Sequence, residues 1–138
     1  MSEPLEPQQL KIQKGIRLAE DTLVTAIQTA LDDKTSYGNL EESQFRNLVR
    51  VADSTESTEV IKNFLLYQLG REKKWGTGQN SLAKKIIHDI DNKIKSLAKD
   101  IATEAKANDF LNTIWLELTR RYLGYGARYL VYKNKGEF

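Results

Sequence analysis

The chain has 138 residues, of which 40% are hydrophobic and 29% charged, a size and composition typical of one domain with a buried core. It contains no cysteine and one histidine, His88, which excludes disulfides, thiol nucleophiles, cysteine-ligated metals and histidine-rich metal sites. The formal net charge is only +2, but it is unevenly distributed: residues 1–69 carry 7 basic and 11 acidic side chains, and residues 70–138 carry 14 and 8.

The first seven residues predict a short flexible tail. Residues 1–7 hold both prolines of the chain and are acidic, without the basic start and apolar stretch of a signal peptide. The longest charge-free stretch, Thr22–Leu31, has 10 residues, about half of what a membrane span needs. We therefore expect one helical-bundle domain over residues 8–135, a cytoplasmic location and no membrane contact.

Two helices are predicted in the first part of the chain. No proline follows residue 7, so a helix can continue there without interruption. Apolar residues spaced mostly by fours indicate a helix that begins near Pro7 and ends near Leu31, followed by a loop over residues 32–38. A second helix is expected over residues 40–52. Its apolar stripe consists of Phe45, Leu48, Val49 and Ala52.

A third helix is predicted to follow directly. Asp53 or Ser54 can cap its first turn, and Lys73 and Lys74 suit the negative end of its dipole. Two glycines within residues 75–80 then break the chain.

The remaining residues predict two longer helices. Ser81 can cap a helix over residues 82–107, whose apolar residues recur at steps of three and four. Asn108 or Asp109 can cap the last helix, which we expect to extend to about Tyr132.

Two features of the last helix bear on the fold class. Gly124 and Gly126 could kink it or end it early, because each costs about 1 kcal/mol relative to alanine. Residues 129–132 resemble a strand in isolation, but a lone strand has no partner. We therefore predict an all-α fold, a compact bundle of about five helices with short loops.

Paired carboxylates are the first candidates for catalysis, because helical metal-dependent nucleotide hydrolases place Glu-x-x-Glu opposite Glu-x-x-Asp. Glu56 and Glu59 supply the first half, but no matching second half follows, and acids in a first turn stabilise a helix through its dipole. Asp89 and Asp91 are two residues apart and diverge on a helix. Together with the isolated His88, these patterns predict no enzyme activity, no metal and no cofactor.

Basic side chains on the second and third predicted helices are more informative. Arg46 and Arg50 are i,i+4 neighbours roughly opposite the apolar stripe, so they project together away from the core. On the third helix, Gln68 and Arg71 lie within about 80° of Val60, inside an apolar arc where an unpaired charge is costly.

Arg71 therefore either forms a structural ion pair or meets a polar partner. Lys62 and Lys73 share the other face of the same predicted helix.

The stretch over residues 120–135 carries five basic residues, no acid and four tyrosines. Basic groups interleaved with aromatic rings suit a phosphate backbone. The tyrosines continue an apolar helix face, so we expect the rings to be mostly packed and the arginines to make the contacts. A second apolar stripe on this helix must be covered, either centrally in the bundle or by a neighbouring subunit. It consists of Leu116, Leu123, Ala127 and Leu130.

Three segments, in this order, resemble the small subunit of type III CRISPR-Cas effector complexes, the Csm kind. They are Ser43-Gln-Phe-Arg-Asn-Leu48, Asn63-Phe-Leu-Leu-Tyr-Gln-Leu-Gly-Arg71 and Arg121-Tyr-Leu-Gly-Tyr-Gly-Ala-Arg-Tyr-Leu-Val-Tyr-Lys133. The resemblance covers about residues 40–133. The pair Gly124 and Gly126 and the loop over residues 75–80 depart from the family pattern, which indicates a divergent subtype.

The resemblance implies a compact five-helix protein without catalysis of its own, stacked head to tail in several copies inside a ribonucleoprotein. Such a subunit contacts guide RNA, target RNA and the other subunits of the complex. Carried over by position, Arg46, Gln68 and Arg71 match the polar motif residues, and Lys133 matches the terminal lysine.

The leading expectation is therefore a non-catalytic subunit that contacts RNA backbone and does not read bases. The candidate RNA-binding residues are Arg46, Arg50, Lys62, Gln68, Arg71, Lys73, Lys74, Arg120, Arg121, Arg128 and Lys133. The alternative is a helical protein-protein adaptor or oligomerisation module without nucleic-acid binding. A carboxylate-metal nucleotide hydrolase is disfavoured.

Overall fold

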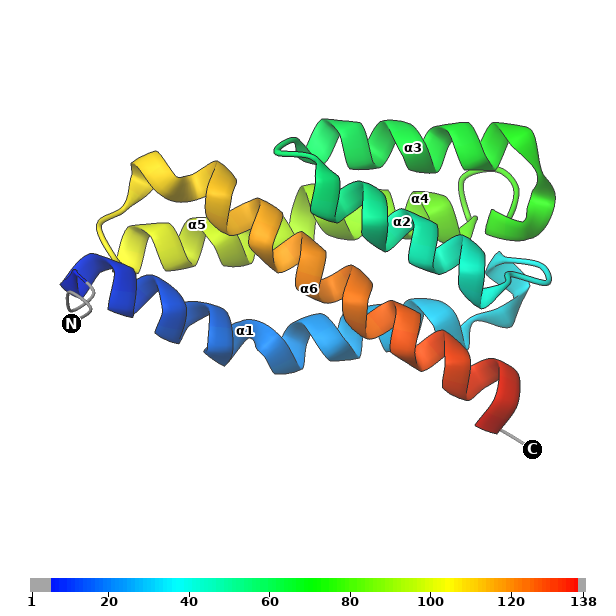
Figure 1. Ribbon diagram of the computed structural model, residues 1–138, viewed down its shortest axis with the longest axis horizontal. Coiled ribbons are helices and arrows are strands. Elements are labelled where there is room, and N and C mark those ends of the chain that lie inside the picture. The colour runs from blue at the N-terminus through cyan, green and yellow to red at the C-terminus, as the bar shows by residue number, and fades with distance from the viewer. Residues whose placement is uncertain (1–5, 137–138) are drawn as a thin grey trace.

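The computed structural model describes residues 6–136, which form five helical rods and no strand (Figure 1). The rods are α1 (Pro7–Asp32), α2 (Glu42–Ser54), α3 (Thr58–Arg71), a long rod made of α4 (Leu82–Asp89), the π-helical segment Ile90–Ile94 and α5 (Lys95–Glu104), and α6 (Leu111–Val131). Three 3₁₀ turns, Lys34–Ser36, Lys73–Trp75 and Asn108–Phe110, lie in the connections, and a π-helical turn, Tyr132–Gly136, follows α6. The predicted all-α bundle of about five helices is confirmed.

The predicted tail lies mostly outside the described residues, which begin at Glu6. Within them, Glu6 is the N-cap of α1 and Pro7 its first residue, so the helix begins inside the segment expected to be tail. Proline suits this position because its missing N–H would have no partner there. No helix in residues 6–136 is long and apolar enough to cross a membrane.

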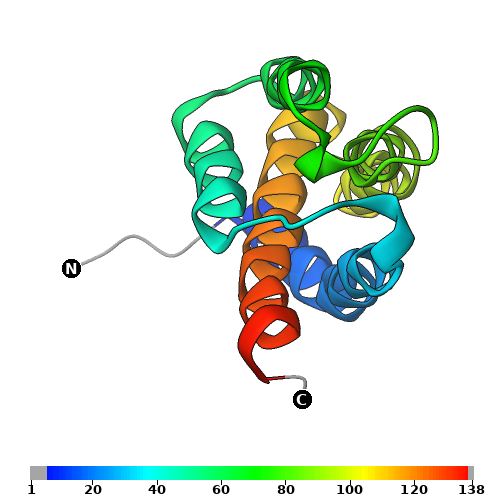
Figure 2. The same cartoon turned by 90° about the vertical axis from the view of Figure 1, so that its right-hand side faces the viewer.

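The last helix, α6, occupies the centre of the bundle, with the other helices arranged around it (Figure 2). It packs against α1, α2 and α5. Both of its apolar stripes are covered within the chain: Leu118 and Tyr122 of the first are fully buried, and so are Leu123 and Leu130 of the second. The second stripe therefore follows from the central position of α6 and requires no neighbouring subunit.

The two glycines of α6 do not end it early, since the helix continues to Val131. A Cβ at position 126 would lie only 2.6 Å from Phe45 Cζ and 2.7 Å from Ile27 Cγ1. Gly126 therefore lets α6 approach α1 and α2 closely, whereas a Cβ on Gly124 would meet open space. Residues 129–131, which resemble a strand in isolation, are helical.

The helix ends were predicted less well than the helices. Ser81 caps α4 as expected, because its hydroxyl accepts a hydrogen bond from the Lys84 amide at 3.1 Å. The expectation that Asp53 or Ser54 begins the third helix is wrong, because both are the last residues of α2.

The predicted caps of the last helix are also displaced. Asn108 and Asp109 lie in a 3₁₀ turn, and Phe110 is the N-cap of α6. On α2, Glu41 and Gln44 form an unpredicted reciprocal capping box.

The predicted helix over residues 82–107 ends at Glu104 and contains an unpredicted π-helical segment. The Trp115 indole N–H donates to the Ile90 carbonyl oxygen at 2.8 Å, and the Asn92 side-chain amide donates to the His88 carbonyl oxygen at 2.9 Å. A π turn leaves a backbone carbonyl oxygen without its usual helical donor. Side-chain N–H groups therefore donate to carbonyl oxygens in this stretch.

Candidate nucleic-acid interface

The eleven candidate RNA-binding residues do not form a single patch. They lie on α2, on α3 and the turn after it, on α6, and just beyond α6. Apart from the uncharged Gln68, their side chains fall into two groups, those already paired within the fold and those whose charge is free. The distinction matters because a paired cation must break an ion pair before it can bind a phosphate.

Basic side chains line two separate hollows along α2, which together we call the groove, and both hollows also contain acidic side chains: Asp53 and Glu117 in the first, Glu41 and Glu42 in the second. One hollow of about 590 Å³ is lined by Val49 and Asp53 of α2 and by Arg120, Arg121 and Arg128 of α6, among others. A second hollow of about 460 Å³ lies between the start of α2 and the turn after α6 and is lined by residues that include Arg46 and Lys135. Lys135 forms an ion pair with Glu42 at 3.2 Å.

Arg50 is exposed on the same helix as Arg46 and donates a hydrogen bond to the Asn47 side chain at 2.9 Å. The predicted outward projection of Arg46 and Arg50 agrees with their exposure.

Arg120 holds the end of α2 in place. Its guanidinium donates to the carbonyl oxygens of Ala52 at 2.9 Å and Thr55 at 2.7 Å, and lies 3.8 Å from a Glu56 carboxylate oxygen. The last carbonyls of a helix have no partner within it, and a cation there also compensates the dipole. Arg120 is thus a capping residue of the fold.

Arg121 ties α6 to α1. It forms ion pairs with Glu20 and, at 2.9 Å, with Glu117. The hydrogen bond to Glu117 raises the pKa of the Arg121 guanidinium above its ordinary value, against the opposing effect of burial. Both of its carboxylate partners compete with any phosphate.

Lys133 is similarly engaged near the end of the chain. Its ammonium lies 3.1 Å from an Asp32 carboxylate oxygen and 5.8 Å from the centre of the Tyr129 ring. The Tyr129 hydroxyl also donates to Asp32 at 2.6 Å. This hydrogen bond, more than Lys133 itself, lowers the pKa of Asp32 below its ordinary value, although burial opposes the shift.

Two lysines of the α3 region are paired as well. Lys62 lies 2.7 Å from both Glu59 and Asp91, and these hydrogen bonds raise its pKa although burial opposes the shift. Lys74 lies 2.8 Å from Glu41, and this hydrogen bond raises the pKa of the lysine.

Gln68 belongs to the core face of α3, where only 8% of it is exposed. That face also carries Thr58, Ile61 and Leu65. The arc that contains Val60 and Arg71 therefore faces outward, and the structural ion pair considered for Arg71 is not among those described.

Five of the eleven candidates remain available. They are Arg46, Arg50, Arg71, Lys73 and Arg128, all exposed and none in an ion pair among the described residues. Arg46, Arg50 and Arg128 belong to the two helices that form the groove, whereas Arg71 and Lys73 lie at the end of α3.

Three further exposed cations were not among the candidates. Lys11, Lys14 and Arg17 follow one another at steps of three on α1, and none has an ion-pair partner within residues 6–136. They were overlooked because residues 1–69 carry more acidic than basic side chains. Their regular spacing on a predicted helix could have identified them.

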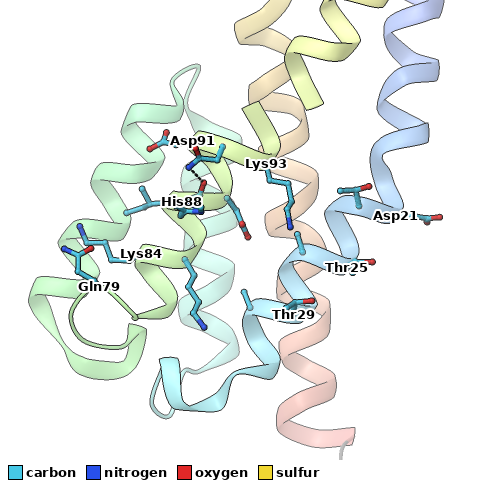
Figure 3. A pocket seen from close by; sticks show the side chains of 15 residues that line it. Asp21, Thr25, Thr29, Gln79, Lys84, His88, Asp91 and Lys93 are labelled. Carbon is cyan, nitrogen blue, oxygen red and sulfur yellow. Dashed lines mark hydrogen bonds between the residues drawn. The ribbon is translucent and has the colours of Figure 1, made fainter. Parts of the chain in front are cut away.

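A larger cleft of about 840 Å³ separates α1 from α4 (Figure 3). Much of its charge is used internally: Lys85 pairs with Asp33, and Asp91 with Lys62. Asp89 accepts a hydrogen bond from the buried Tyr122 hydroxyl at 2.7 Å. Burial, followed by the charge of this carboxylate, raises the pKa of Tyr122 well above its ordinary value.

No described histidine and carboxylate groups cluster in a way that could hold a metal ion. The imidazole of His88 is exposed at the edge of the cleft and makes no described hydrogen bond. Of the two acids considered for a metal pair, Glu59 binds Lys62 and Glu56 lies near Arg120.

Comparison with known proteins adds no relative: no family model, no curated protein and no solved structure matches the chain.

Proposed function

We propose that the chain is a non-catalytic, RNA-binding small subunit of a type III CRISPR ribonucleoprotein effector, stacked in several copies along guide and target RNA. The observation that supports RNA binding best is that each of the two hollows along α2 is lined by an arginine with free charge, Arg128 in the hollow between α2 and α6 and Arg46 in the hollow beside the end of the chain. The CRISPR assignment rests on the three sequence segments that resemble that family.

The groove suits a flexible polyanion better than a compact ligand. Its free cations lie on the exposed sides of two helices, and Arg50 is a further exposed cation of α2. Guanidinium groups donate bidentate hydrogen bonds to phosphate oxygens, and contacts of this kind are indifferent to base sequence. Guide and target RNA, other subunits and further copies of the chain are the proposed partners.

Charge reversal on α2 tests the RNA-binding part of the proposal. The double variant Arg46→Glu, Arg50→Glu should lower affinity for single-stranded RNA by about tenfold or more at moderate salt, because two phosphate contacts are lost and two repulsions gained. Filter binding or fluorescence anisotropy measures this change. The matched control is Lys93→Glu, Lys99→Glu, which reverses two exposed lysines of the long rod and alters the net charge equally.

Unchanged affinity in the α2 variant, or an equal loss in the control, would refute the groove as the contact surface. The CRISPR assignment has its own test. Purification of the tagged chain from its native cells should recover an RNA of uniform length together with larger proteins, and recovery of neither would count against it.

An adaptor that meets only protein is the second candidate, favoured by apolar side chains on the outer side of α3. Val60 is 47% exposed and Leu66 46%. An adaptor should show no salt-dependent RNA binding under conditions where it still captures a protein partner.

A further inference from the structure

Three neighbouring side chains of α3 form a group that contact with an RNA backbone alone does not explain: the half-buried Phe64 and the exposed Tyr67 and Arg71, which we call the Tyr67 stack. The Phe64 and Tyr67 ring centres are 6.4 Å apart, and Arg71 Cζ lies 5.9 Å from the centre of the Tyr67 ring. Tyr67 is 57% exposed. The fold therefore holds an aromatic ring beside a guanidinium on an open surface.

Packing against the core accounts for the position of Phe64 but not for the exposed ring of Tyr67. The core face of α3 carries the fully buried Ile61 and Leu65, and Tyr67 lies away from that face. Tyr67 contributes no hydrogen bond among the described residues, and its contacts with Phe64 and Arg71 lie within one helix. Exposed aromatic side chains that the fold does not need are candidates for ligand contact.

The exposed charges beside the Tyr67 stack favour an anionic ligand. No acidic residue occurs between Lys62 and Arg71, and Arg71 and Lys73 are exposed and without an ion-pair partner in the described part of the chain. The nearest acid in sequence, Glu72, accepts a hydrogen bond from the Gln44 side chain at 2.6 Å. An anionic ligand with a planar apolar part fits both features.

We propose that Tyr67, supported by Arg71, stacks on an unpaired base of single-stranded RNA, while Arg71 and Lys73 contact the adjoining phosphates. This inference rests on the proposed RNA-binding function and extends it from backbone contact to base stacking. A ring stacks on any base, so the contact adds affinity without reading sequence. Duplex RNA, whose bases are already stacked, should not gain from it.

The test compares Tyr67→Ala with Tyr67→Phe in the full chain, using fluorescence anisotropy with a short labelled oligouridylate. Tyr67→Ala should weaken binding by about fivefold or more through loss of stacking on one base, while the ring retained in Tyr67→Phe should preserve it. Tyr132→Ala is the matched control, because Tyr132 is also exposed, at 51%, but lies beyond α6.

A second ligand separates stacking from charge. Against an abasic strand of the same length, wild type and Tyr67→Ala should bind equally, because only the sugar-phosphate backbone remains. An equal loss on both strands would overturn the proposal. So would loss of a co-purifying protein with RNA affinity unchanged, which would identify the Tyr67 stack as a protein contact.

The outcomes also distinguish this inference from the function on which it rests. If Tyr67→Ala binds oligouridylate like wild type while Arg46→Glu, Arg50→Glu binds it poorly, base stacking is refuted and the groove stands. If the wild-type chain binds neither strand, the RNA-binding function and the stacking proposal fail together.

Discussion

At the scale of single residues, the role of a basic side chain depends on whether its charge is already used within the fold. Arg120 and Arg128 lie two turns apart on α6 and line the same hollow. Arg120 donates to two backbone carbonyls at the end of α2, whereas Arg128 is exposed with no described partner. Identical residue types on one helix therefore have different expected functions.

Truncation of the two arginines should therefore affect different properties, stability for Arg120 and RNA binding for Arg128. Arg120→Ala should lower the free energy of unfolding by about 1–3 kcal/mol, because it leaves the Ala52 and Thr55 carbonyl oxygens without their donor. Arg128→Ala should change it by no more than about 0.5 kcal/mol and should instead weaken RNA binding. Urea unfolding followed by circular dichroism measures the first quantity. Equal stability of the two variants would contradict the capping role of Arg120.

At the scale of the elements, the sequence predicted the number of helices because the signals are local. Both prolines lie in the first seven residues, and apolar residues recur at steps of three and four. Each helix carries these signals within its own sequence. The buried face of α3 could not be decided from the sequence for a physical reason: Val60 and Phe64 form one apolar arc, and Ile61 and Leu65 form another. When a helix is apolar on two sides, only its neighbours decide which side is buried.

The two glycines of α6 provide a prediction at this scale, because one is required by packing and the other is not. Gly124→Ala should raise the free energy of unfolding by about 0.5–1 kcal/mol, since alanine favours the helix and its Cβ meets open space. Gly126→Ala should lower it, by about 1–3 kcal/mol, because the new methyl group overlaps Phe45 and Ile27.

Thermal or urea unfolding of the two variants checks the opposite signs. Because both substitutions are chemically identical and two residues apart, helix propensity cancels in the comparison. Stabilisation by both would mean that α6 is not closely packed against α1 and α2 at position 126.

At the scale of the whole molecule, the fold was predictable from the sequence and the available charge was not. Arg121 pairs with Glu20, Lys62 with Asp91 and Lys133 with Asp32. Each pair joins residues far apart in the sequence, so periodicity within one helix cannot reveal it. The number of basic residues therefore overestimates the number of cations whose charge is free. Counting charges separately in residues 1–69 and 70–138 also misses Lys11, Lys14 and Arg17.

The salt dependence of binding measures how many cations are available. Each phosphate contact to single-stranded RNA contributes about −0.7 to the slope of log K against log salt. The five free candidates therefore predict a slope of about −3.5, whereas all ten basic candidates would give about −7. Arg46→Glu, Arg50→Glu should reduce the magnitude by about 1.4, and the control Lys93→Glu, Lys99→Glu should leave it unchanged.

A wild-type slope near −7 would show that internal ion pairs such as Lys62–Asp91 open when RNA binds. That outcome would contradict the division of the candidates into paired and free, because an opened pair frees a carboxylate that repels the strand. A slope near −3.5 that becomes shallower only in the α2 variant would instead assign the contacts to the groove and the end of α3. Fold and charge pairing would then jointly determine how RNA is bound, and neither the net charge of +2 nor the number of basic residues would predict it.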